Sequence, residues 1–575
     1  MTRNSSQVEV AFQKHNHYWL DVGLIGLYTL LGKGQNDHNI VVSLSDDKLV
    51  LIGTTEEIKN ALQDAYNLLI DEHYDVSTDA QRSNQSSYNF YYDSAKKEFI
   101  RFPKKASVGL AKLIYNKAAR PTKGKINWVK TEEKKKCSGI LPSDHANLQA
   151  ALEEFLKATG LKITMESLLI DGPYEVRPKM EIDISGKKLT GERCFLCGEE
   201  GSKFRGINET VYPFITGDSG VLSFNSTGGK PARVCWKCDL LGKFVPVVAF
   251  YLEQDKKLYA FLPYSTSLTV MQRAYEGLRL AYKEDPNRHQ NFYFLLGSHA
   301  TFKRSSEALF AFLYTVFRKL QSGNASQQPN PSDLQLLFGP LAKEFVSSAP
   351  LEFVILQAFQ KGSTMMGENF WVFRDSIYFF RLIAYLESKG INLEKVMSIL
   401  IDRTQELKDQ TIIRDRICER ILKKQSVLGI VETFISRPDN KSLQYIAPLV
   451  DLVCAYEPII RTKGGSMTNE DQDVAVTLGK RIGWITVALQ KRDKKNPDKS
   501  SLYALRRVRK KTDFLNELNR LQFKYGLVVP PEVYGGSLTD ENFPEFKGFC
   551  LIAALNSFGA ASADEKKTDA TREER

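Results

Sequence analysis

Hydrophobic residues recur with two different periods along this chain, and the change of period divides it into two halves. In the first half, 40–44 and 48–52 alternate between apolar and polar residues as strands do, with Asp46 and Asp47 as the turn between them. The other segments expected in this half are strands at 245–252 and 258–262 and helices at 22–31 and 58–70. The first half is therefore expected to mix helices and strands.

From about residue 265 the spacing of apolar residues is helical and remains so to the C-terminus. Ser305 and Ser306 can cap the first of these helices, and Gly323 can end it. A linker rich in Ser, Asn, Gln and Pro follows at 322–332, and the charged tail after Phe558 is expected to be disordered. The further expected helices are one from Asp375 to a stop at Gly390 and those at 393–408, 411–424, 443–457, 474–489 and 502–518.

The composition is that of a globular protein. The chain has 575 residues, of which 42% are hydrophobic and 26% are charged, so about three or four domains are expected. No apolar run approaches the roughly 18 residues that span a bilayer. The N-terminus lacks the basic-then-apolar order of a signal peptide. These features predict a cytoplasmic protein with no membrane partner.

Positive charge is concentrated in two segments. The chain carries a net charge of +11, whereas residues 96–136 hold fourteen basic and three acidic side chains, and residues 491–511 hold ten basic and two acidic ones. The remainder is therefore acidic. A solvated lysine-rich face can explain one such segment, but two of them favour a partner with a phosphate backbone. In the first segment the lysines are interleaved with rings on which bases could stack, namely Phe99, Phe102, Tyr115 and Trp128.

Four of the eight cysteines form two Cys-x-x-Cys pairs, Cys194 with Cys197 and Cys235 with Cys238, separated by 37 residues. Each pair can place two thiolates on one edge of a tetrahedron, and two pairs complete a zinc site with four sulfur ligands. Gly198, Gly201 and Gly242 follow the pairs and suit the tight turns of zinc knuckles. A redox pair would be single, and disulfides or chance spacing are the remaining alternatives. We expect a structural zinc ion, because four thiolates leave no open position for catalysis.

With this metal module the sequence predicts an α+β fold. It consists of a mixed α/β N-terminal half with a zinc-knuckle insertion and an α-helical C-terminal half that ends in a helical bundle. The expected domains are an α/β domain with the first basic segment (1–189), a zinc-binding module with the four cysteines (190–245), a mainly helical middle region (246–460) and a helical C-terminal domain (461–575).

No catalytic motif is found in the sequence. The phosphate-binding loop Gly-x-x-x-x-Gly-Lys-Ser/Thr, the His-Glu-x-x-His zinc motif and the Gly-x-Ser-x-Gly nucleophile elbow are absent. His15 and His17 could hold a metal, but histidines that flank one residue are more often surface residues, and this interpretation is favoured. The other cysteines are expected to be small core residues: Cys137, Cys418, Cys454 and Cys550. We therefore expect a binding protein and not an enzyme.

The order of these features resembles a known family. A paired Cys-x-x-Cys insertion in an α/β N-terminal half, followed by a helical half, resembles the large subunit of type I CRISPR effector complexes (Cascade). The opening Asp21-Val-Gly-Leu-Ile-Gly-Leu-Tyr is similar to that of subtype I-B large subunits. Such a subunit is not catalytic: it reads the protospacer-adjacent motif on duplex DNA, aids R-loop formation and recruits the helicase–nuclease. The implied partners are guide RNA, target double-stranded DNA, the Cascade backbone and 5′-handle-binding subunits, the small subunit and the helicase–nuclease.

The resemblance implies roles for individual basic residues. The candidates for phosphate contacts near the bound duplex are Lys104, Lys105, Lys123, Lys125 and Lys130. Asn225 and Lys230 flank a Gly pair between the knuckles and could read base edges, although an ordinary turn with Asn and Gly is the favoured interpretation of this segment. The residues expected to follow a displaced or target DNA strand are Arg506, Arg507, Arg509, Lys510 and Lys511.

The C-terminal segment that begins at Met467 has the properties of a separate product. It contains 109 residues, its first residues include Thr468 or Asn469 as a helix cap, and the preceding Lys-Gly-Gly can be encoded by a purine-rich ribosome-binding sequence. In several similar Cascade subtypes a small subunit is translated from within the large-subunit gene, so Met467 is a candidate internal start. A chance methionine after a flexible linker is the alternative.

Two other classes of protein remain open. One is a zinc-ribbon RNA-binding protein, which would bind RNA without a partner complex. The other is a degenerate polymerase-like or nuclease-like enzyme whose acidic site has no recognisable motif in the sequence.

Overall fold

The chain folds into two compact units. The structure, a computed structural model, describes residues 7–34, 38–114, 122–123, 127–130, 140–141, 143–162, 167–172, 175–184, 193–201, 204–211, 213–214, 233–254, 256–281, 302–322, 349–362, 364–437, 446–461, 466–492 and 499–573. Unit 1 comprises Met1–Tyr293 and Pro340–Arg374, and unit 2 comprises Phe294–Gly339 and Asp375–Arg575. Unit 1 mixes strands and helices and unit 2 is helical, which confirms the expected α+β fold class.

The described strands of unit 1 form three larger sheets and two strand pairs. The larger sheets have the orders β1-β3-β2, β5-β4-β8-β7 and β12-β13-β14-β15, and the pairs are β10-β11 and β6-β9. The strands are β1 (Val8–Gln13), β2 (Val41–Leu44), β3 (Lys48–Gly53), β4 (Asn89–Asp93), β5 (Glu98–Phe102), β6 (Thr122–Lys123), β7 (Asn127–Lys130), β8 (Ser167–Ile170), β9 (Glu175–Val176), β10 (Phe204–Gly206), β11 (Arg233–Cys235), β12 (Phe250–Gln254), β13 (Lys257–Tyr264), β14 (Glu352–Lys361) and β15 (Thr364–Phe373).

The helices of unit 1 are mostly short. They are α1 (Tyr18–Lys33), α2 (Thr55–Leu69), η2 (Ile70–Tyr74), α3 (Asp79–Ser83), η3 (Gln85–Ser87), α4 (Ala111–Ile114), η5 (Ser143–Leu148), α5 (Gln149–Thr159), α6 (Trp236–Lys243), η7 (Val245–Val247) and α7 (Leu268–Ala281). The predicted hairpin is present as β2 and β3, and the predicted helix at 58–70 begins earlier because Thr54 and Glu57 form a capping box.

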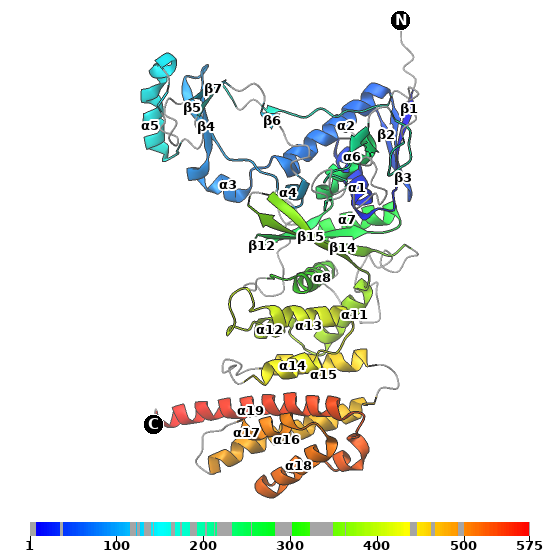
Figure 1. The fold of residues 1–575 in the computed structure, drawn as a ribbon, viewed down its shortest axis with the longest axis vertical. Coiled ribbons are helices and arrows are strands. Elements are labelled where there is room, and N and C mark those ends of the chain that lie inside the picture. The colour runs from blue at the N-terminus through cyan, green and yellow to red at the C-terminus, as the bar shows by residue number, and fades with distance from the viewer. Residues whose placement is uncertain are drawn as a thin grey trace. The chain divides into compact units, whose positions relative to one another are not determined.

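Helix α1 is the centre of unit 1. Nearly all of its residues from Trp19 to Leu31 are buried, which is the pattern of a helix enclosed on every side. It begins at Tyr18, four residues before the predicted start, because the His17 side chain accepts a hydrogen bond from the Leu20 amide and Asp21 lies in the first turn. Figure 1 shows α1 beside α6, although more than 200 residues separate them in the sequence.

Two predictions about strands are wrong. The helical pattern expected from residue 265 onward is interrupted by the antiparallel hairpin of β14 and β15, which extends the β12-β13 sheet. β14 lies between two other strands, and Phe353, Val354, Ile355 and Leu356 are all fully buried, so no apolar–polar alternation identifies it as a strand. The expected strand at 245–252 begins only at Phe250, because Pro246 lies in the short helix η7.

Unit 2 consists of layers of helices: Figure 1 shows α8, then α11 to α13, then α14 and α15, and after these α19, which lies between α14 and α15 on one side and α16 to α18 on the other. The helix predicted after Ser305 and the helix predicted between Asp375 and Gly390 are present as α8 and α11. The helices are α8 (Ser305–Ser322), α11 (Ser376–Ser388), α12 (Leu393–Ile399), α13 (Ile412–Leu422), α14 (Leu428–Ile435), α15 (Ala447–Ile460), α16 (Asn469–Arg492), α17 (Ser500–Arg507), α18 (Lys511–Tyr525), η9 (Val533–Ser537) and α19 (Phe543–Glu573). The predicted linker lies outside the described residues from 323 onward.

Helices α16 to α19 form the predicted C-terminal bundle. α16 and α19 pack closely, and the absence of a side chain at Gly479 and Gly483 allows this approach. A side chain at either position would collide with the backbone of α19 at Cys550 or Ala554. The helix predicted at 502–518 is in fact two helices, α17 and α18, separated by the extended backbone of Val508. The tail after Phe558 continues α19 to Glu573, so the expected disorder is wrong.

Candidate metal centre

The two Cys-x-x-Cys pairs lie on different local structures in unit 1. Cys194 and Cys197 occupy a turn that Gly198 ends with a positive φ of 73°, and the Gly198 amide donates to the Cys194 carbonyl. Cys235 ends β11, and Cys238 lies in the first turn of α6. The turn glycine is therefore as predicted after the first pair. Gly242 has another role, because it lies inside α6 against the carbonyl of Thr210.

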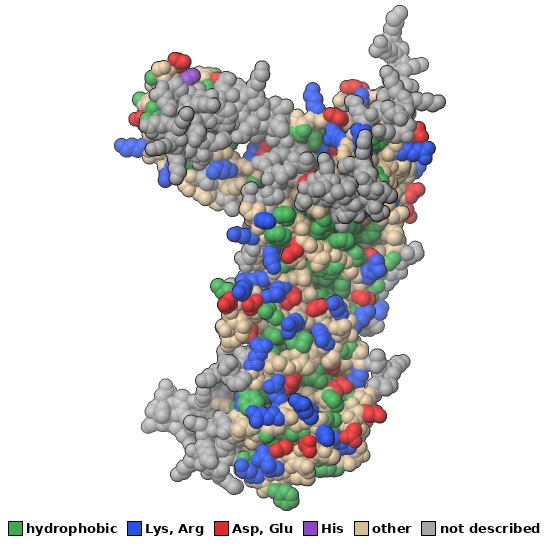
Figure 2. Space-filling model, in the orientation of Figure 1, with side chains coloured by type: hydrophobic (Ala, Val, Ile, Leu, Met, Phe, Trp, Pro, Cys, Tyr) green, Lys and Arg blue, Asp and Glu red, His purple; other side chains and the backbone are tan. Residues whose placement is uncertain are grey.

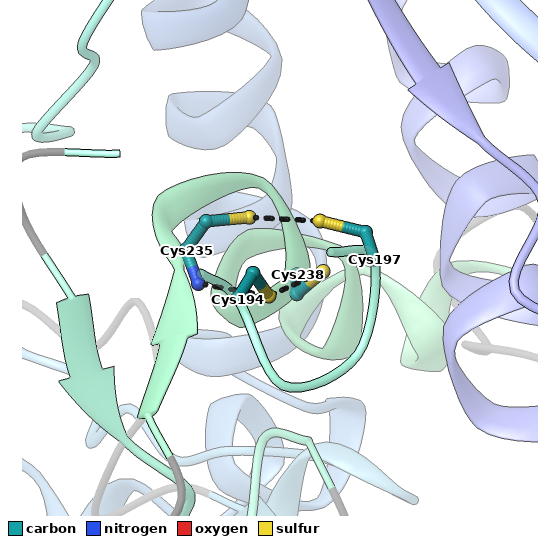
Figure 3. A group of neighbouring side chains, drawn as sticks. All are labelled: Cys194, Cys197, Cys235 and Cys238. Carbon is teal, nitrogen blue, oxygen red and sulfur yellow. Dashed lines mark hydrogen bonds between the residues drawn. The ribbon is translucent and has the colours of Figure 1, made fainter. Parts of the chain in front are cut away.

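The four sulfur atoms form one cluster, drawn in Figure 3. The Sγ atoms of Cys194 and Cys238 are 3.7 Å apart and those of Cys197 and Cys235 are 3.6 Å apart, and all four lie within 4.8 Å of one another. Zinc–sulfur bonds of about 2.3 Å in a tetrahedron place sulfur atoms roughly 3.8 Å apart. The four cysteines are therefore close enough to bind one metal ion, and the arrangement is consistent with zinc.

The cluster is shielded from water and supported by the backbone. Cys194, Cys235 and Cys238 are buried, and Cys197 is half-buried. The Cys235 amide donates to the Cys194 sulfur at 3.3 Å, and the Phe195 amide donates to the Arg233 carbonyl at 3.0 Å, which joins the two knuckles. Few apolar side chains surround the cysteines; the buried ones are Phe204, Ile207, Val211 and Val234. A bound ion would therefore add substantially to the stability of so small a core.

A buried ionic group lies next to the cluster on α6. Asp239 accepts hydrogen bonds from the Lys243 ammonium at 2.9 Å, the Thr210 hydroxyl at 2.9 Å and the Arg205 guanidinium at 3.1 Å. Burial raises the pKa of Asp239, but Lys243, Thr210 and Arg205 lower it further than burial raises it, so the carboxylate stays charged. These contacts connect α6 to the segment 204–211 and thereby fix the second knuckle.

The segment that carries the cysteines packs directly on α1. A side chain at Gly23 or Gly26 would collide with the carbonyl oxygens of Leu241 or Phe244, so both glycines are needed for the close approach of α6 and η7. The Trp19 indole also donates to the Thr210 carbonyl at 2.8 Å. The opening Asp21–Tyr28, which carries part of the family resemblance, is thus the surface on which the cysteine segment docks.

His15 also lies at the cluster. Its Nε2 atom is 3.2 Å from the Cys238 sulfur and its side chain is 6% exposed, so the prediction of a surface histidine is wrong. His17 is half-buried, and burial, followed by the effect of His15, lowers the pKa of His17 to about 4. Since 223 residues separate His15 from Cys238, no local pattern in the sequence could identify this contact.

The lysines predicted to bind phosphate in unit 1 lie in separate elements. Lys105 forms an ion pair with Asp75 at 2.9 Å, and Lys104 is half-buried beside it. Lys123 is in β6 and Lys130 is in β7, in different sheets. Lys125, Asn225 and Lys230 lie outside the described residues. Of the interleaved rings, Phe99 is half-buried and packs against Phe90, Tyr92 and Phe155.

The C-terminal basic residues have two different roles. Arg506 forms an ion pair with Glu432 of α14 at 2.7 Å, so it holds the bundle to the preceding layer. Lys547 of α19 donates to the carbonyls of Arg506 and Val508, which fixes the break between α17 and α18. Burial lowers the pKa of Lys547, and Arg506 and Arg509 act in the same direction.

The residues presented to solvent by this break are Arg507, Arg509 and Lys510, whereas Lys511 is half-buried. Figure 2 shows a face of unit 2 on which basic and acidic side chains are mixed. Within the described part of unit 2, however, Arg507, Arg509 and Lys510 form no ion pair. These three exposed cations are candidates for contacts with an anionic partner.

Two of the remaining cysteines, Cys418 and Cys550, are core residues as predicted. Cys418 and Cys550 are fully buried, Cys454 is half-buried, and Cys137 lies outside the described residues. Among the described residues, the four-cysteine cluster is the one group of His, Cys, Asp or Glu side chains identified as able to hold a metal. None of the described helices is long and apolar enough to cross a membrane. Comparisons of the chain with family models and with curated proteins find no match.

Proposed function

We propose that the protein is the non-catalytic large subunit of an RNA-guided CRISPR effector complex of the Cascade type. In this role it binds the guide-RNA complex, recognises the protospacer-adjacent motif on duplex DNA, aids R-loop formation and recruits the helicase–nuclease. The observation that carries the proposal is the four-cysteine cluster built into an α/β unit and followed by a helical unit. The resemblance to these large subunits depends on the same arrangement.

The metal in this proposal is a structural zinc ion. Four thiolates fill a tetrahedral coordination sphere, so the ion has no position for water or substrate. Its role is to hold β11 and α6 against α1, where Gly23 and Gly26 allow close backbone contact. The site thereby supplies a rigid surface in unit 1 and takes no part in chemistry.

The class of protein can be tested by the nucleic acid that the chain carries. A tagged chain purified from its native cells is expected to bring with it several other subunits in fixed ratio and short RNAs that share one 5′ handle. Random cellular RNA bound without other subunits would instead indicate a zinc-ribbon RNA-binding protein. Metal-dependent cleavage of labelled DNA by the isolated chain would indicate an enzyme.

The three exposed cations at the break between α17 and α18 are the proposed contact of unit 2 with a DNA strand. Replacement of Arg507, Arg509 and Lys510 by alanine is expected to weaken DNA binding and to reduce the slope of log K against log salt by roughly 2 to 3 units, because each phosphate contact contributes about 0.7 to 0.9. Filter binding or fluorescence anisotropy at several salt concentrations measures this slope.

The matched control removes three basic side chains that already have acidic partners. Lys423, Lys424 and Arg520 form ion pairs with Glu419, Asp375 and Glu517, so their replacement by alanine removes the same charge from the same unit. The effect of this control variant on the slope of log K against log salt is expected to be small. Equal losses in the two triple variants would show that DNA senses only net charge.

We further propose that Met467 is an internal translation start for a small subunit. The bundle of α16 to α19 has its own core, in which α16 and α19 meet at Gly479 and Gly483. Thr468 caps α16 as predicted, because its hydroxyl accepts from the Asp471 amide at 3.1 Å and its amide donates to the Asp471 carboxylate at 2.9 Å. The separate product would therefore contain a complete bundle.

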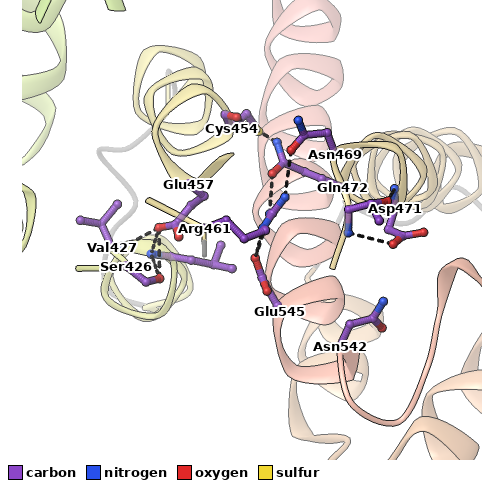
Figure 4. Close-up of polar contacts among 12 residues, drawn as sticks. Ser426, Val427, Cys454, Glu457, Arg461, Asn469, Asp471, Gln472, Asn542 and Glu545 are labelled. Atoms are coloured by element: carbon purple, nitrogen blue, oxygen red, sulfur yellow. Dashed lines mark hydrogen bonds and ion pairs between the residues drawn. The ribbon is translucent and has the colours of Figure 1, made fainter. Parts of the chain in front are cut away.

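The full chain nevertheless holds this bundle to the preceding layer through Arg461, as Figure 4 shows. Arg461 donates to Glu545 of α19 at 2.8 Å and to Asn469 and Gln472 of α16 at 3.1 and 2.9 Å, and Gln472 donates to the Cys454 carbonyl of α15. A fragment that begins at Met467 lacks Arg461 and exposes this face of α16 and α19. In the proposed complex another subunit covers that face.

A further inference from the structure

One histidine contacts the metal centre in addition to the four cysteines. The Nε2 atom of His15 is 3.2 Å from the Sγ atom of Cys238, within the usual range of a hydrogen bond to sulfur. The imidazole is 6% exposed, so water does not compete for this contact. Neither the cysteine spacing nor the proposed CRISPR role assigns a function to His15.

The turn that carries His15 is held in place from several sides. It connects β1 to α1, and Asn16 has a positive φ of 54°, which is uncommon outside glycine. The fully buried carboxylate of Asp21 accepts hydrogen bonds from the His15 amide at 2.7 Å and the His17 amide at 3.0 Å. The Tyr264 hydroxyl donates to the same carboxylate at 3.4 Å. The position of the ring is therefore set by the fold and not by the contact alone.

The chemistry of the site decides which ring nitrogen of His15, Nε2 or Nδ1, carries the proton. A metal-bound thiolate has no proton, so Cys238 must accept the bond and Nε2 must donate it. If Nδ1 were protonated instead, a buried donor would have no acceptor, because Nδ1 has no hydrogen-bond partner among the described residues and Oδ1 of Asp21 is 4.0 Å away. A direct metal–imidazole bond would add a fifth ligand to a site that four thiolates complete.

We propose that His15 is a positioning residue of the metal centre, whose Nε2–H donates to the Cys238 thiolate. Four thiolates around one divalent ion carry an excess of negative charge, and a donor to sulfur disperses it. The Cys235 amide acts in the same way on Cys194. His15 thus raises the affinity for the metal, protects Cys238 from electrophiles, and joins the metal centre to the β1–α1 turn.

This inference depends on the metal centre and is independent of the proposed CRISPR role. It is tested on the full chain loaded with Co²⁺, which reports thiolate ligands through its charge-transfer absorption. In H15F we expect this band to move to longer wavelength, metal affinity in chelator competition to fall about 10- to 100-fold, and alkylation of the metal-loaded protein to become faster. H15Q should remain close to wild type, because the glutamine amide N–H reaches the position of Nε2–H.

H38F is the matched control, because His38 pairs with Asp64 at the surface and is not part of the cysteine cluster. If H15F has the absorption, affinity and alkylation rate of wild type, His15 is only a packed ring and the proposal is wrong. A wild-type Co²⁺ spectrum typical of three sulfurs and one nitrogen, with tight binding retained in C238S, would make His15 a ligand and also overturn it. If H15F does not fold, ¹⁵N shifts of His15 in the wild-type chain decide: an Nε2–H tautomer supports the proposal and an Nδ1–H tautomer contradicts it.

Discussion

Removal of the metal is expected to unfold the cysteine segment and to destabilise unit 1 as a whole. Structural zinc contributes about 10 to 16 kcal/mol of apparent binding energy in isolated zinc fingers, whereas a typical domain is stable by only about 5 to 15 kcal/mol. The cluster has few apolar side chains to replace that contribution. Because α6 and η7 pack on the central helix α1, the loss is transmitted to the core of the unit.

The variant for this test replaces Cys194 and Cys235 by serine, one from each knuckle. Metal analysis should find one zinc ion per wild-type chain and none in the variant. Calorimetry should show a transition of unit 1 that is lower by at least about 5 to 10 °C, since a loss of about 5 kcal/mol shifts so large a unit by roughly 1 to 2 °C per kcal/mol. The transition of unit 2 should remain in place.

Cys454→Ser is the control, because Cys454 is half-buried in α15 of unit 2 and belongs to no cluster identified among the described residues. It makes the same chemical change without touching the metal centre. Purified wild-type protein without bound metal, together with a double variant that melts like wild type, would contradict the assignment of the site.

The cluster of four cysteines could be predicted from the sequence because its signal is local. Each Cys-x-x-Cys pair fixes two thiolates by its own turn, and only one further step, the meeting of two pairs, had to be inferred. The contact of His15 with Cys238 gave no such signal, since 223 residues separate them and the turn geometry depends on Asp21. The supporting residue of the site is therefore a tertiary feature.

The same distinction explains the fold. Helices of unit 2 with one apolar face, such as α8 and α11, are encoded by their own spacing and were predicted. Strand β14 was missed because both of its faces are buried, which removes the alternation of period two. The ion pair of Arg506 could not be predicted from the sequence either, because its partner Glu432 belongs to α14, in the layer before the bundle. A run of basic residues predicts that the segment lies at the surface. Which of its cations pair with acidic side chains is known only from the fold.

A second protein band of about one-fifth of full length is expected from the unmodified gene when it carries a C-terminal tag. The band corresponds to the 109 residues from Met467 to the C-terminus, translated from the internal start. Met467→Leu should abolish it. Leucine is the appropriate replacement because Met467 is 2% exposed, and an apolar side chain of similar volume keeps the packing of the full-length chain.

Two controls separate translation from proteolysis. Met397→Leu changes another buried methionine of unit 2 and should leave the short band unchanged. Synonymous codons at 463–465 that disrupt the purine-rich run should weaken the band without altering the protein at all. A short band that persists in Met467→Leu would be a degradation product, and its absence from the unmodified gene would end the proposal. Since the fragment lacks Arg461, which binds Glu545 and Gln472 in the full chain, it should also melt at a lower temperature alone than when bound to the subunit that covers this face.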